Sequence, residues 1–482
     1  MLLIISLAWL TSCDQAVPAP PLAAGPGAPA LILMIVIDTL RHDHVGGELT
    51  PVLNALARRS LVFANARTTS SWTGSSVASM FTSRFPTEVG VLARDDVLGP
   101  TAVTLAEALR AGGNYECAGI TTNTNAGDKL GIAQGFDSFI MPDVSTAKSY
   151  PDDHLMFPAR SVTEAAVSFL RDRSTRPHQR PCFLFLHYID PHAPYLPHPG
   201  ILPTREPDGR FDGSRRQLDV VDAMSVEDLT AADRARIKYL YAADVKYCDD
   251  WIGGVLREVA AQGLASSTMV IVTADHGEGL WNHGIRNHGR DLYEEMLHVP
   301  LIVHYPGMRE SDSRTIATPV SLLDLAPTIL AACHIPQPQE FHGQDLEPLA
   351  RGKRRDQELD DIYSEMAFDR VNLECLRRGR FKLIRDRDRS EADPTSYQLF
   401  DLAEDPGEQH NLIGARPDVE ADLQRALKRC ATVIARGARP RVKLALDDLP
   451  PFDLDILRSL GYVGSQEYET TIARRQAGSK PQ

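Results

Sequence analysis

The sequence predicts an α/β fold whose central sheet is built from buried strands and crossover helices. Apolar runs occur at 31–37, 181–186 and 270–272, the last of them β-branched, and an amphipathic helical pattern over 237–264 directly precedes this last run. Continuous apolar runs are typical of strands buried on both faces, and a helix between two such strands is typical of a parallel crossover. With 482 residues, 43% of them hydrophobic, the chain can bury one large core and a smaller one.

Each apolar run is followed by acidic or imidazole side chains. Asp38 follows the first run, His192 lies shortly after the second, and Asp275 and His276 follow the third. The carboxyl ends of parallel strands meet at one edge of an open α/β sheet, where ligands bind. Carboxylates and imidazoles are ligands for divalent cations. We therefore expect Asp38, Asp275 and His276 to form a metal site at this edge, with His192 close by.

Longer segments around these residues resemble the sulfatase branch of the alkaline phosphatase superfamily. The resemblance covers residues 31–465 and is carried by VIDTLRHDHVG (36–46), TPVLNALARRSLVFANA (50–66), FLFLHYIDPHAPY (183–195), VTADHGEGLWNHG (272–284), NHGRDLYEEMLHVPLIVHYPG (287–307), VSLLDLAPTIL (320–330) and YQLFDLAEDPGEQHNL (397–412). It implies a large α/β sandwich around a mixed central sheet, followed by a small domain with a short antiparallel sheet. It also implies a metal-dependent ester hydrolase.

The resemblance breaks at the position of the nucleophile. Ordinary sulfatases carry Cys-x-Pro-Ser-Arg, whose Cys is converted to formylglycine. Here Thr73 stands at the Cys position, and Ser75 and Val77 replace the Pro and the Arg that guide the conversion, so formylglycine cannot form. A Thr hydroxyl that faces a divalent cation can instead be deprotonated and become a nucleophile. The alternative interpretation is that Thr73 only caps the helix expected over 77–81.

This change of nucleophile favours phosphoester chemistry over sulfate ester chemistry. A formylglycine hydrate releases sulfate by collapsing to the aldehyde, whereas a Thr ester has no such exit, so water must attack its central atom. That step is routine for a phosphoryl group, because a cation and nearby donors stabilise its equatorial oxygens. We therefore predict a hydrolase or transferase of phosphate mono- and diesters. The alternatives are a sulfatase that works without formylglycine and a non-catalytic relative that binds an anionic glycan or lipid head group.

The resemblance implies roles for further residues. It makes the Thr73 hydroxyl a further metal ligand, gives His192 a role in substrate binding, and places His288 against the substrate or its leaving group. Asn123 stands for an anion-binding residue, although it also fits a turn. His276 replaces the Asn of calcium-type sulfatases, and its nitrogen favours one bound Mn²⁺ or Zn²⁺ over Ca²⁺ or Mg²⁺.

Several neighbouring residues are given lesser roles. Thr39 replaces a second acidic residue of the family's first strand, which weakens or removes one ligand. Structural or orienting roles are expected for four polar residues of the same motifs, namely Arg41, His187, Asp190 and His283.

The N-terminal 30 residues indicate export. The apolar stretch Leu2–Leu10 is too short to span a bilayer, and it runs into Leu10-Thr11-Ser12-Cys13, which resembles a bacterial lipobox with Cys13 as the acylated residue. A Pro/Ala/Gly-rich linker follows, up to residue 30. We expect an exported, periplasmic or cell-surface lipoprotein that is anchored to the membrane through Cys13. A frayed apolar N-terminus is the alternative.

The rest of the chain divides into three predicted parts. A catalytic domain spans 31–355, a small C-terminal subdomain spans 356–464, and a disordered tail spans 465–482. Within the subdomain, the segments 374–384 and 397–402 are predicted to be paired strands, and 417–435 is predicted to be a helix with Pro417 at its first position.

Charge and cysteine usage exclude other classes. The net charge is −13 and no basic run occurs, which argues against a nucleic-acid partner. The expected partner is an anionic ester, on a phosphorylated or sulfated glycan, lipid or small molecule. No Cys-x-x-Cys spacing indicates a zinc ribbon. Cys117 and Cys182 lie in strand-like contexts and are expected to be buried thiols.

Overall fold

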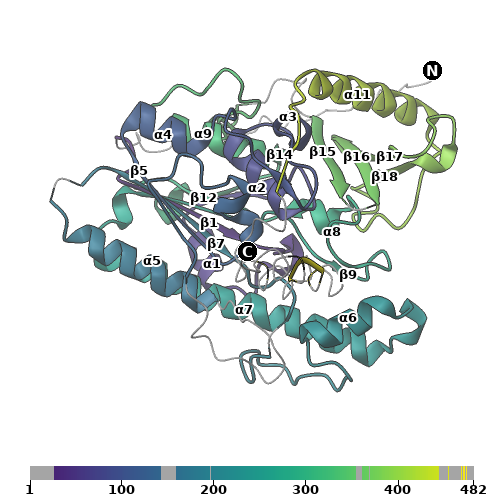
Figure 1. Cartoon of the computed structure of the whole chain (residues 1–482), viewed down its shortest axis with the longest axis horizontal. Helices are drawn as coiled ribbons and strands as arrows, with labels where there is room; N and C mark the ends of the chain where they lie inside the picture. The colour runs from purple at the N-terminus through teal and green to yellow at the C-terminus, as the bar shows by residue number, and fades with distance from the viewer. Residues whose placement is uncertain are drawn as a thin grey trace, which may run out of the picture.

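The computed structural model describes residues 27–142, 159–177, 179–195, 197–353, 361–368 and 370–444, together with a few residues between 454 and 474. Its centre is a mixed eight-stranded sheet (Figure 1). The strands run in the order β13 (Arg314–Ile316), β2 (Leu61–Phe63), β12 (Leu301–His304), β8 (Thr268–Thr273), β1 (Leu31–Ile37), β7 (Cys182–Tyr188), β5 (Glu116–Thr121) and β6 (Ser138–Ile140).

The four central strands are parallel. β1 pairs in parallel with β7 on one side and with β8 on the other, and β7 pairs in parallel with β5. β12 is antiparallel to both β8 and β2, which makes the sheet mixed. Every residue of β1 is buried, as its unbroken apolar run predicts for a strand covered on both faces. The predicted strands at 31–37, 181–186 and 270–272 therefore lie side by side, and their carboxyl ends share one edge.

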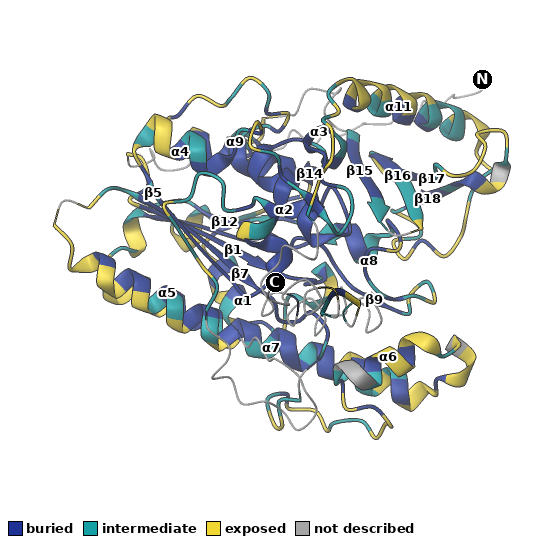
Figure 2. Cartoon of the chain, viewed as in Figure 1, coloured by how far each residue is buried: buried dark blue, intermediate teal, exposed yellow. Residues whose placement is uncertain are grey.

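Helices cover both faces of this sheet (Figure 1). On one face lie α5 (Ala159–Ser174) and the 31-residue α7 (Ala231–Ala261), and on the other lie α2 (Thr73–Thr82), α4 (Leu105–Gly113) and α9 (Leu325–Ala332). Figure 2 shows that α7 turns a buried face toward the sheet. Shorter helices are α1 (Pro51–Ala57), α3 (Pro86–Val89), α6 (Arg215–Ala223), α8 (Glu294–Leu297) and α10 (Glu347–Ala350).

The helix α7 begins six residues earlier than the apolar pattern predicts, and it ends three residues earlier. Its start is set by Thr230, whose hydroxyl accepts a hydrogen bond from the Asp233 backbone while the Asp233 carboxylate reaches back to Thr230. This capping box satisfies donors of the first turn. The helix leads into β8, so β7, α7 and β8 form the predicted crossover around β1.

The C-terminal part forms an antiparallel sheet of β15 (Asp361–Phe368), β16 (Val371–Arg378), β17 (Phe381–Asp386) and β18 (Tyr397–Asp401), packed against α11 (Pro417–Arg436). The helix prediction for 417–435 is confirmed within one residue. The predicted pairing of 374–384 with 397–402 is confirmed, because β17 pairs with β18, but the first segment contains two strands and not one. Gly379 adopts a φ of +56° there, and the chain turns back between β16 and β17. Glycine tolerates this left-handed conformation without steric strain.

A buried group of charged side chains links the part of the chain that contains the large sheet to the C-terminal part. Lys382 on β17 lies 3.1 Å from Glu294 and 2.9 Å from Glu408, and Glu294 also pairs with Arg67. Lys382 and Glu408 are both almost completely buried. Burial favours loss of the lysine's proton, but Glu408 and Glu294 raise the Lys382 pKa above its usual value. The two parts are therefore held together by paired charges as well as by apolar contacts.

Short strands outside the two larger sheets pair with one another, and the cysteines are unpaired within the described ranges. β9 (Gly279–Leu280) pairs with β10 (Arg286–Asn287), β3 (Ala66–Arg67) lies between β11 (His298–Val299) and β14 (Val320–Ser321), and β19 (Val442–Lys443) pairs with β4 (Asp96–Val97). Cys117 and Cys182 are buried free thiols, as predicted, and the other cysteines within the described ranges are also free.

Some of the predicted features lie on residues that the structure does not describe. The lipobox and Cys13 lie outside the described residues, as do most of the tail over 465–482 and the boundary at residue 355. Within the tail, a few residues are described in helical conformation, and one of them, Thr471, is buried. None of the described helices is both long enough and apolar enough to cross a membrane.

Candidate metal centre and active site

The carboxyl ends of β1 and β8 bring two acidic residues together, although 237 positions separate them in the sequence. Asp38 follows β1 directly, and Asp275 comes two residues after the end of β8. The strands are paired in register from Leu31 with Thr268 to Val36 with Thr273, so both chains leave the sheet at the same level. Both carboxylates and the adjacent His276 are completely buried.

Three side chains converge on one point. One oxygen of Asp38, one oxygen of Asp275 and one ring nitrogen of His276 all lie within 4.8 Å of one another. His276 Nε2 is 3.8 Å from Asp38 Oδ1 and 3.7 Å from Asp275 Oδ2. The structure therefore brings together the three residues that the strand ends predict.

The opposite atom of each of these side chains is held by a hydrogen bond. Asp275 Oδ1 accepts from the backbone N–H groups of Thr39 (3.2 Å) and His276 (2.8 Å). Asp38 Oδ2 accepts from the Asn123 amide (2.6 Å), and His276 Nδ1 donates to the Gly277 carbonyl (2.9 Å). Asp38 Oδ1 and Asp275 Oδ2 have no hydrogen-bond partner among the residues that the structure describes. Each side chain thus presents one atom to the centre of the group.

The electrostatics of the group suit a cation. Burial and the neighbouring Asp275 raise the pKa of Asp38 well above its usual value. Burial acts in the same direction on Asp275, but His276 and His187 lower its pKa. Burial lowers the pKa of His276 to about 4, so its ring is neutral at pH 7, the form that binds a metal. Two buried carboxylate oxygens without a hydrogen bond, beside a neutral imidazole, fit a divalent ion.

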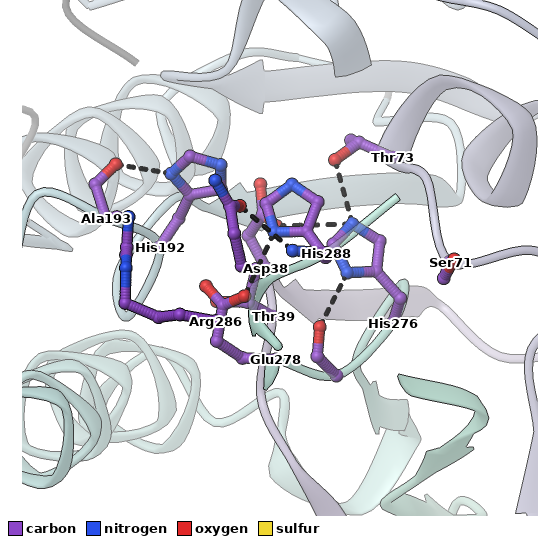
Figure 3. A network of polar contacts seen from close by, with 12 residues as sticks. Asp38, Thr39, Ser71, Thr73, His192, Ala193, His276, Glu278, Arg286 and His288 are labelled. Carbon is purple, nitrogen blue, oxygen red and sulfur yellow. Dashed lines mark hydrogen bonds and ion pairs between the residues drawn. The ribbon is translucent and has the colours of Figure 1, made fainter. Parts of the chain in front are cut away.

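Thr73 lies at the same centre. It is the first residue of α2, and its Oγ1 lies 3.2 Å from His276 Nε2 (Figure 3). Trp72, not Thr73, occupies the cap position of the helix, and neither side chain caps it. The interpretation of Thr73 as a simple helix cap is therefore wrong. The Ser76 hydroxyl, one turn on, donates to the Asp275 carbonyl over 2.7 Å and ties the start of the helix to the Asp275 loop.

Two further histidines border this centre. The His288 ring lies 4.5 Å from that of His276 and 4.9 Å from that of His192, measured between ring centroids. His288 Nδ1 is 3.3 Å from Glu278 Oε1 (Figure 3). Tyr195 donates to the other oxygen of Glu278 over 3.1 Å. With Nδ1 facing a carboxylate, Nε2 of His288 is the nitrogen left for a substrate. The structure therefore brings His192 and His288 together beside the metal group.

Glu278 and His192, the two ionisable side chains next to His288, differ in charge at neutral pH. Burial alone would raise the pKa of Glu278, but His288, His192 and Arg286 lower it to about 2. Burial and the neighbouring His288 lower the pKa of His192 to about 3. At neutral pH the site therefore holds an ionised Glu278 and a neutral His192.

Asn123 makes a different contact from the predicted one. It is fully buried, its amide nitrogen donates to Asp38, and its carbonyl oxygen accepts from the Asn125 backbone. These contacts orient the carboxylate of Asp38, whereas the sequence predicted that Asn123 contacts the anionic substrate. The amide lies in the turn after β5, so the turn interpretation of its position is also met.

The four residues with expected structural or orienting roles behave differently from one another. His187 Nε2 lies 3.6 Å from Oδ2 of Asp275, an acidic residue of the metal group. Arg41 pairs with Asp43 and donates to the Glu278 carbonyl. His283 pairs with Glu295 and stacks on Tyr293, away from the metal group. Asp190 is buried, and burial together with Asp244 raises its pKa.

The sequence did not single out Glu278 or Tyr195. Glu278 lies in the same strand-end cluster as Asp275, and Tyr195 closes the segment that contains His192. An acidic residue ten positions before His288 was a usable signal, because a carboxylate commonly fixes the orientation of a functional histidine.

Most of the chain is similar in sequence to sulfatases. A family model described as Sulfatase matches residues 30–335, and a second, described as N-sulphoglucosamine sulphohydrolase, C-terminal, matches residues 282–433. The ulvan-active sulfatase of Formosa agariphila is 23% identical over 444 residues, which cover 87% of this chain and 83% of that protein. The chain spans only 51% and 37% of the length of two other curated sulfatases that it matches.

Solved structures share the fold. One, a complex with D-glucosamine-2-N,6-O-disulfate as its substrate, superposes with a TM-score of 0.65 at 18% identity, over 85% of this chain and 98% of that one. A phosphonate monoester hydrolase of Agrobacterium radiobacter superposes with a TM-score of 0.66, also at 18% identity, over 86% of this chain and 100% of that one. The predicted architecture, a large mixed sheet with a small antiparallel C-terminal sheet, is therefore confirmed.

Proposed function

The chain belongs to the sulfatase family and is an ester hydrolase of that family, and we propose that it acts on phosphate mono- and diesters through Thr73 as nucleophile. The observation that supports this most is the position of the Thr73 hydroxyl, 3.2 Å from the ring nitrogen of His276 that also faces Asp38 and Asp275. A hydroxyl in that position is the reacting group that Cys-derived formylglycine supplies in ordinary sulfatases.

One divalent cation would be held by Asp38, Asp275, His276 and the Thr73 oxygen. The imidazole ligand favours Mn²⁺ or Zn²⁺, with Ca²⁺ or Mg²⁺ as further candidates. When bound, the cation would lower the pKa of the Thr73 hydroxyl and offset negative charge on the ester oxygens. The hydrogen bonds to Asn123, to the Thr39 backbone and to the Gly277 carbonyl keep the three other ligands oriented.

The protein's own residues then carry the reaction. Thr73 Oγ, after losing its proton to water, attacks phosphorus, the bond to the ester oxygen breaks, and a phosphothreonine forms. We assign to His288 Nε2 the transfer of a proton to the departing oxygen, an assignment supported by Glu278, which lies 3.3 Å from Nδ1 and orients the ring. His192, 4.9 Å from His288 between ring centroids, is assigned to the substrate's remaining oxygens. Water attacks the phosphothreonine in the second step and restores the Thr73 hydroxyl.

The substrate is proposed to be an anionic ester carried by a glycan, a lipid or a small molecule. One structural neighbour takes a sulfated glucosamine, and another is a phosphonate monoester hydrolase. A sulfate ester is the second candidate, favoured by the match to a sulfatase over 83% of that relative's length. Phosphoester hydrolysis remains our first choice because a sulfated Thr lacks the aldehyde exit.

Turnover of three aryl esters by Thr73 variants tests this proposal. The substrates are 4-nitrophenyl phosphate, bis(4-nitrophenyl) phosphate and 4-nitrophenyl sulfate. We expect Thr73→Ala to lower kcat at least ~10⁴-fold, as loss of a nucleophile does in other hydrolases. Thr73→Ser should keep measurable turnover, because the hydroxyl remains. Thr73→Cys should not gain sulfatase activity, since Ser75 and Val77 still prevent conversion to formylglycine.

The matched control is Thr82→Ala on the same helix. Thr82 is equally buried, and its hydroxyl bonds only to the Ala78 carbonyl within the helix. The Thr82→Ala variant should keep the wild-type kcat. An active Thr73→Ala enzyme would rule out the nucleophile, whereas a wild-type preference for the sulfate ester would keep the site and favour the second candidate.

A further inference from the structure

A buried tyrosine of the long crossover helix contacts the turn that follows β1. Tyr241 lies on α7 and is completely buried. Its hydroxyl donates to the Thr39 carbonyl over 2.8 Å and accepts from the Arg41 backbone N–H over 3.1 Å. A single hydroxyl therefore bridges two peptide groups of the segment that carries Asp38.

The bridged turn has an unusual backbone conformation. Thr39 adopts a φ of +56°, in the left-handed region. For a β-branched residue this is a genuine outlier, which persists only when the surrounding structure holds it in place. Thr39 is fully buried, and its own hydroxyl makes no hydrogen bond within the described ranges. The contacts that hold the turn are thus made by its backbone, and Tyr241 supplies two of them.

This conformation has a direct consequence for the metal group. The Thr39 N–H points at Asp275 Oδ1, 3.2 Å away. Together with the His276 N–H, it gives Asp275 Oδ1 two donors, so that the other oxygen, Oδ2, is the one directed toward Asp38 and His276. If the turn relaxed to an ordinary φ, this N–H would turn away and Asp275 Oδ1 would keep only one of its two donors, the His276 N–H.

We propose that Tyr241 is a positioning residue for the cation site, acting through the backbone of Thr39 on the orientation of Asp275. This inference rests on the ligand set given under the proposed function. Among the described residues the Tyr241 hydroxyl has hydrogen bonds to the backbone of Thr39 and Arg41 and none to a ligand side chain, so it acts on the site through the backbone of the turn.

Cation affinity of the full-length protein tests the proposal without any substrate. Tyr241→Phe keeps the ring and removes only the hydroxyl. We expect its dissociation constant for Mn²⁺, measured by chelator competition, to rise by up to ~10-fold, less than the ~10- to 100-fold that loss of a direct partner of a metal ligand causes. We also expect a changed Mn²⁺ electron paramagnetic resonance spectrum, and a kcat that recovers to within a few-fold of wild type at saturating Mn²⁺.

The matched control is Tyr115→Phe. Tyr115 is equally buried, and its hydroxyl also donates to a backbone carbonyl, that of Pro29, over 2.8 Å. Pro29 precedes β1 and Tyr115 precedes β5, so this contact lies at the amino-terminal edge of the sheet, opposite the metal group. This variant should lose comparable stability and keep the wild-type Mn²⁺ affinity. Equal affinities of wild type and Tyr241→Phe, or equal losses in both variants, would overturn the proposal.

A second variant tests the intermediate role of Thr39. Glycine adopts a positive φ without strain, so Thr39→Gly should hold the turn without help from the hydroxyl. In the Thr39→Gly background, removal of the Tyr241 hydroxyl should weaken Mn²⁺ binding less than it does in wild type. The comparison in the Thr39→Gly background can refute the proposal even if Tyr241→Phe alone folds poorly. An undiminished effect in the double variant contradicts the proposed path through Thr39.

The outcomes also separate this inference from the proposed function. If wild-type protein binds no Mn²⁺, the ligand set is wrong and the role of Tyr241 falls with it. If wild type binds Mn²⁺ and Tyr241→Phe binds it equally well, only the positioning role is wrong, and the proposed site stands.

Discussion

Asn123 donates a hydrogen bond of 2.6 Å to Asp38 Oδ2, and the second oxygen of the same carboxylate, Oδ1, faces His276 Nε2 at 3.8 Å. The amide thus divides the two oxygens of Asp38 between a structural contact and the metal group. Asp275 is divided in the same way by two backbone N–H groups. Each acidic residue is therefore prepared to offer a cation one oxygen and not two.

Removal of the Asn123 amide should weaken cation binding. In Asn123→Ala, Asp38 Oδ2 loses its donor, so the carboxylate can rotate, and we expect a 10- to 100-fold higher Mn²⁺ dissociation constant. Chelator competition measures this value. The control is Asn54→Ala, whose side chain donates to the Gly47 carbonyl at the surface. Unchanged affinity in Asn123→Ala would show that the amide does not orient Asp38.

Native protein should contain about one divalent ion per chain, because one group of two carboxylates and one imidazole is present in the described part of the chain. Elemental analysis of protein purified without chelator measures the content and identifies the metal. Asp275→Ala should abolish binding, because it removes a charged ligand. The absence of Mn, Zn, Mg and Ca from wild-type protein would refute the site.

Breaking the buried charges between the two sheets should destabilise the protein. Lys382→Met leaves Glu408 buried without its cation, and we expect a loss of ~3–5 kcal/mol in the free energy of unfolding. Denaturant unfolding measures it. Arg205→Ala is the control, since Arg205 pairs with Asp208 at the surface with both side chains exposed, and it should change stability by less than ~1 kcal/mol. Equal effects of the two variants would contradict the assigned role of Lys382.

Asp291 should make stability depend on pH. Burial raises the pKa of Asp291 to about 7, from the ordinary aspartate value of 3.8. A raised folded-state pKa means that the folded protein binds the extra proton between these values, so the stability contributed by Asp291 is lost as pH rises from about 4 to about 7. Asp291→Asn cannot ionise, so the difference in unfolding free energy, variant minus wild type, should grow by at least ~1.4 kcal/mol over this range.

Denaturant unfolding at several pH values between 4 and 8 checks this expectation. Asp208→Asn, at an exposed position, should show no such growth over the same range. A constant difference between Asp291→Asn and wild type would mean that Asp291 ionises normally in the folded protein.

The lipobox predicts where the protein resides. If Cys13 is acylated, the protein should partition with membranes when expressed in a bacterial host, and Cys13→Ser should release it into the soluble fraction. Fractionation followed by immunodetection compares the two. Identical distribution of the two forms would refute the lipid anchor.

The elements that the sequence predicted well are those set by local patterns. The run 31–37 is apolar throughout because β1 is covered on both faces, and the polar residues that follow it mark the edge of the sheet. The same reasoning placed Asp38, Asp275 and His276 together. It needed only the rule that parallel strands end at one edge.

The contacts that the sequence did not predict are set by packing between distant segments. Asn123 meets Asp38 across 85 positions, and Tyr241 meets Thr39 across 202. The left-handed backbone of Thr39 has no local signal at all, because a β-branched residue is the least expected one there. Glu278 was missed for another reason, because the orientation of His288 toward it depends on the hairpin of β9 and β10 between them.

The order of the strands also constrains how the protein reaches this state. β1 leaves the ribosome first among the strands, yet its neighbours β7 and β8 begin at residues 182 and 268. Until β7 has been synthesised, the wholly apolar β1 has no partner on either side, and until β8 follows it can pair on one side only. Pairings over such separations form slowly. Asp38 and Asp275 therefore meet only after more than half of the chain exists, so cation binding would report on completed folding. A nascent or truncated chain would instead expose β1, the segment in greatest need of protection from aggregation.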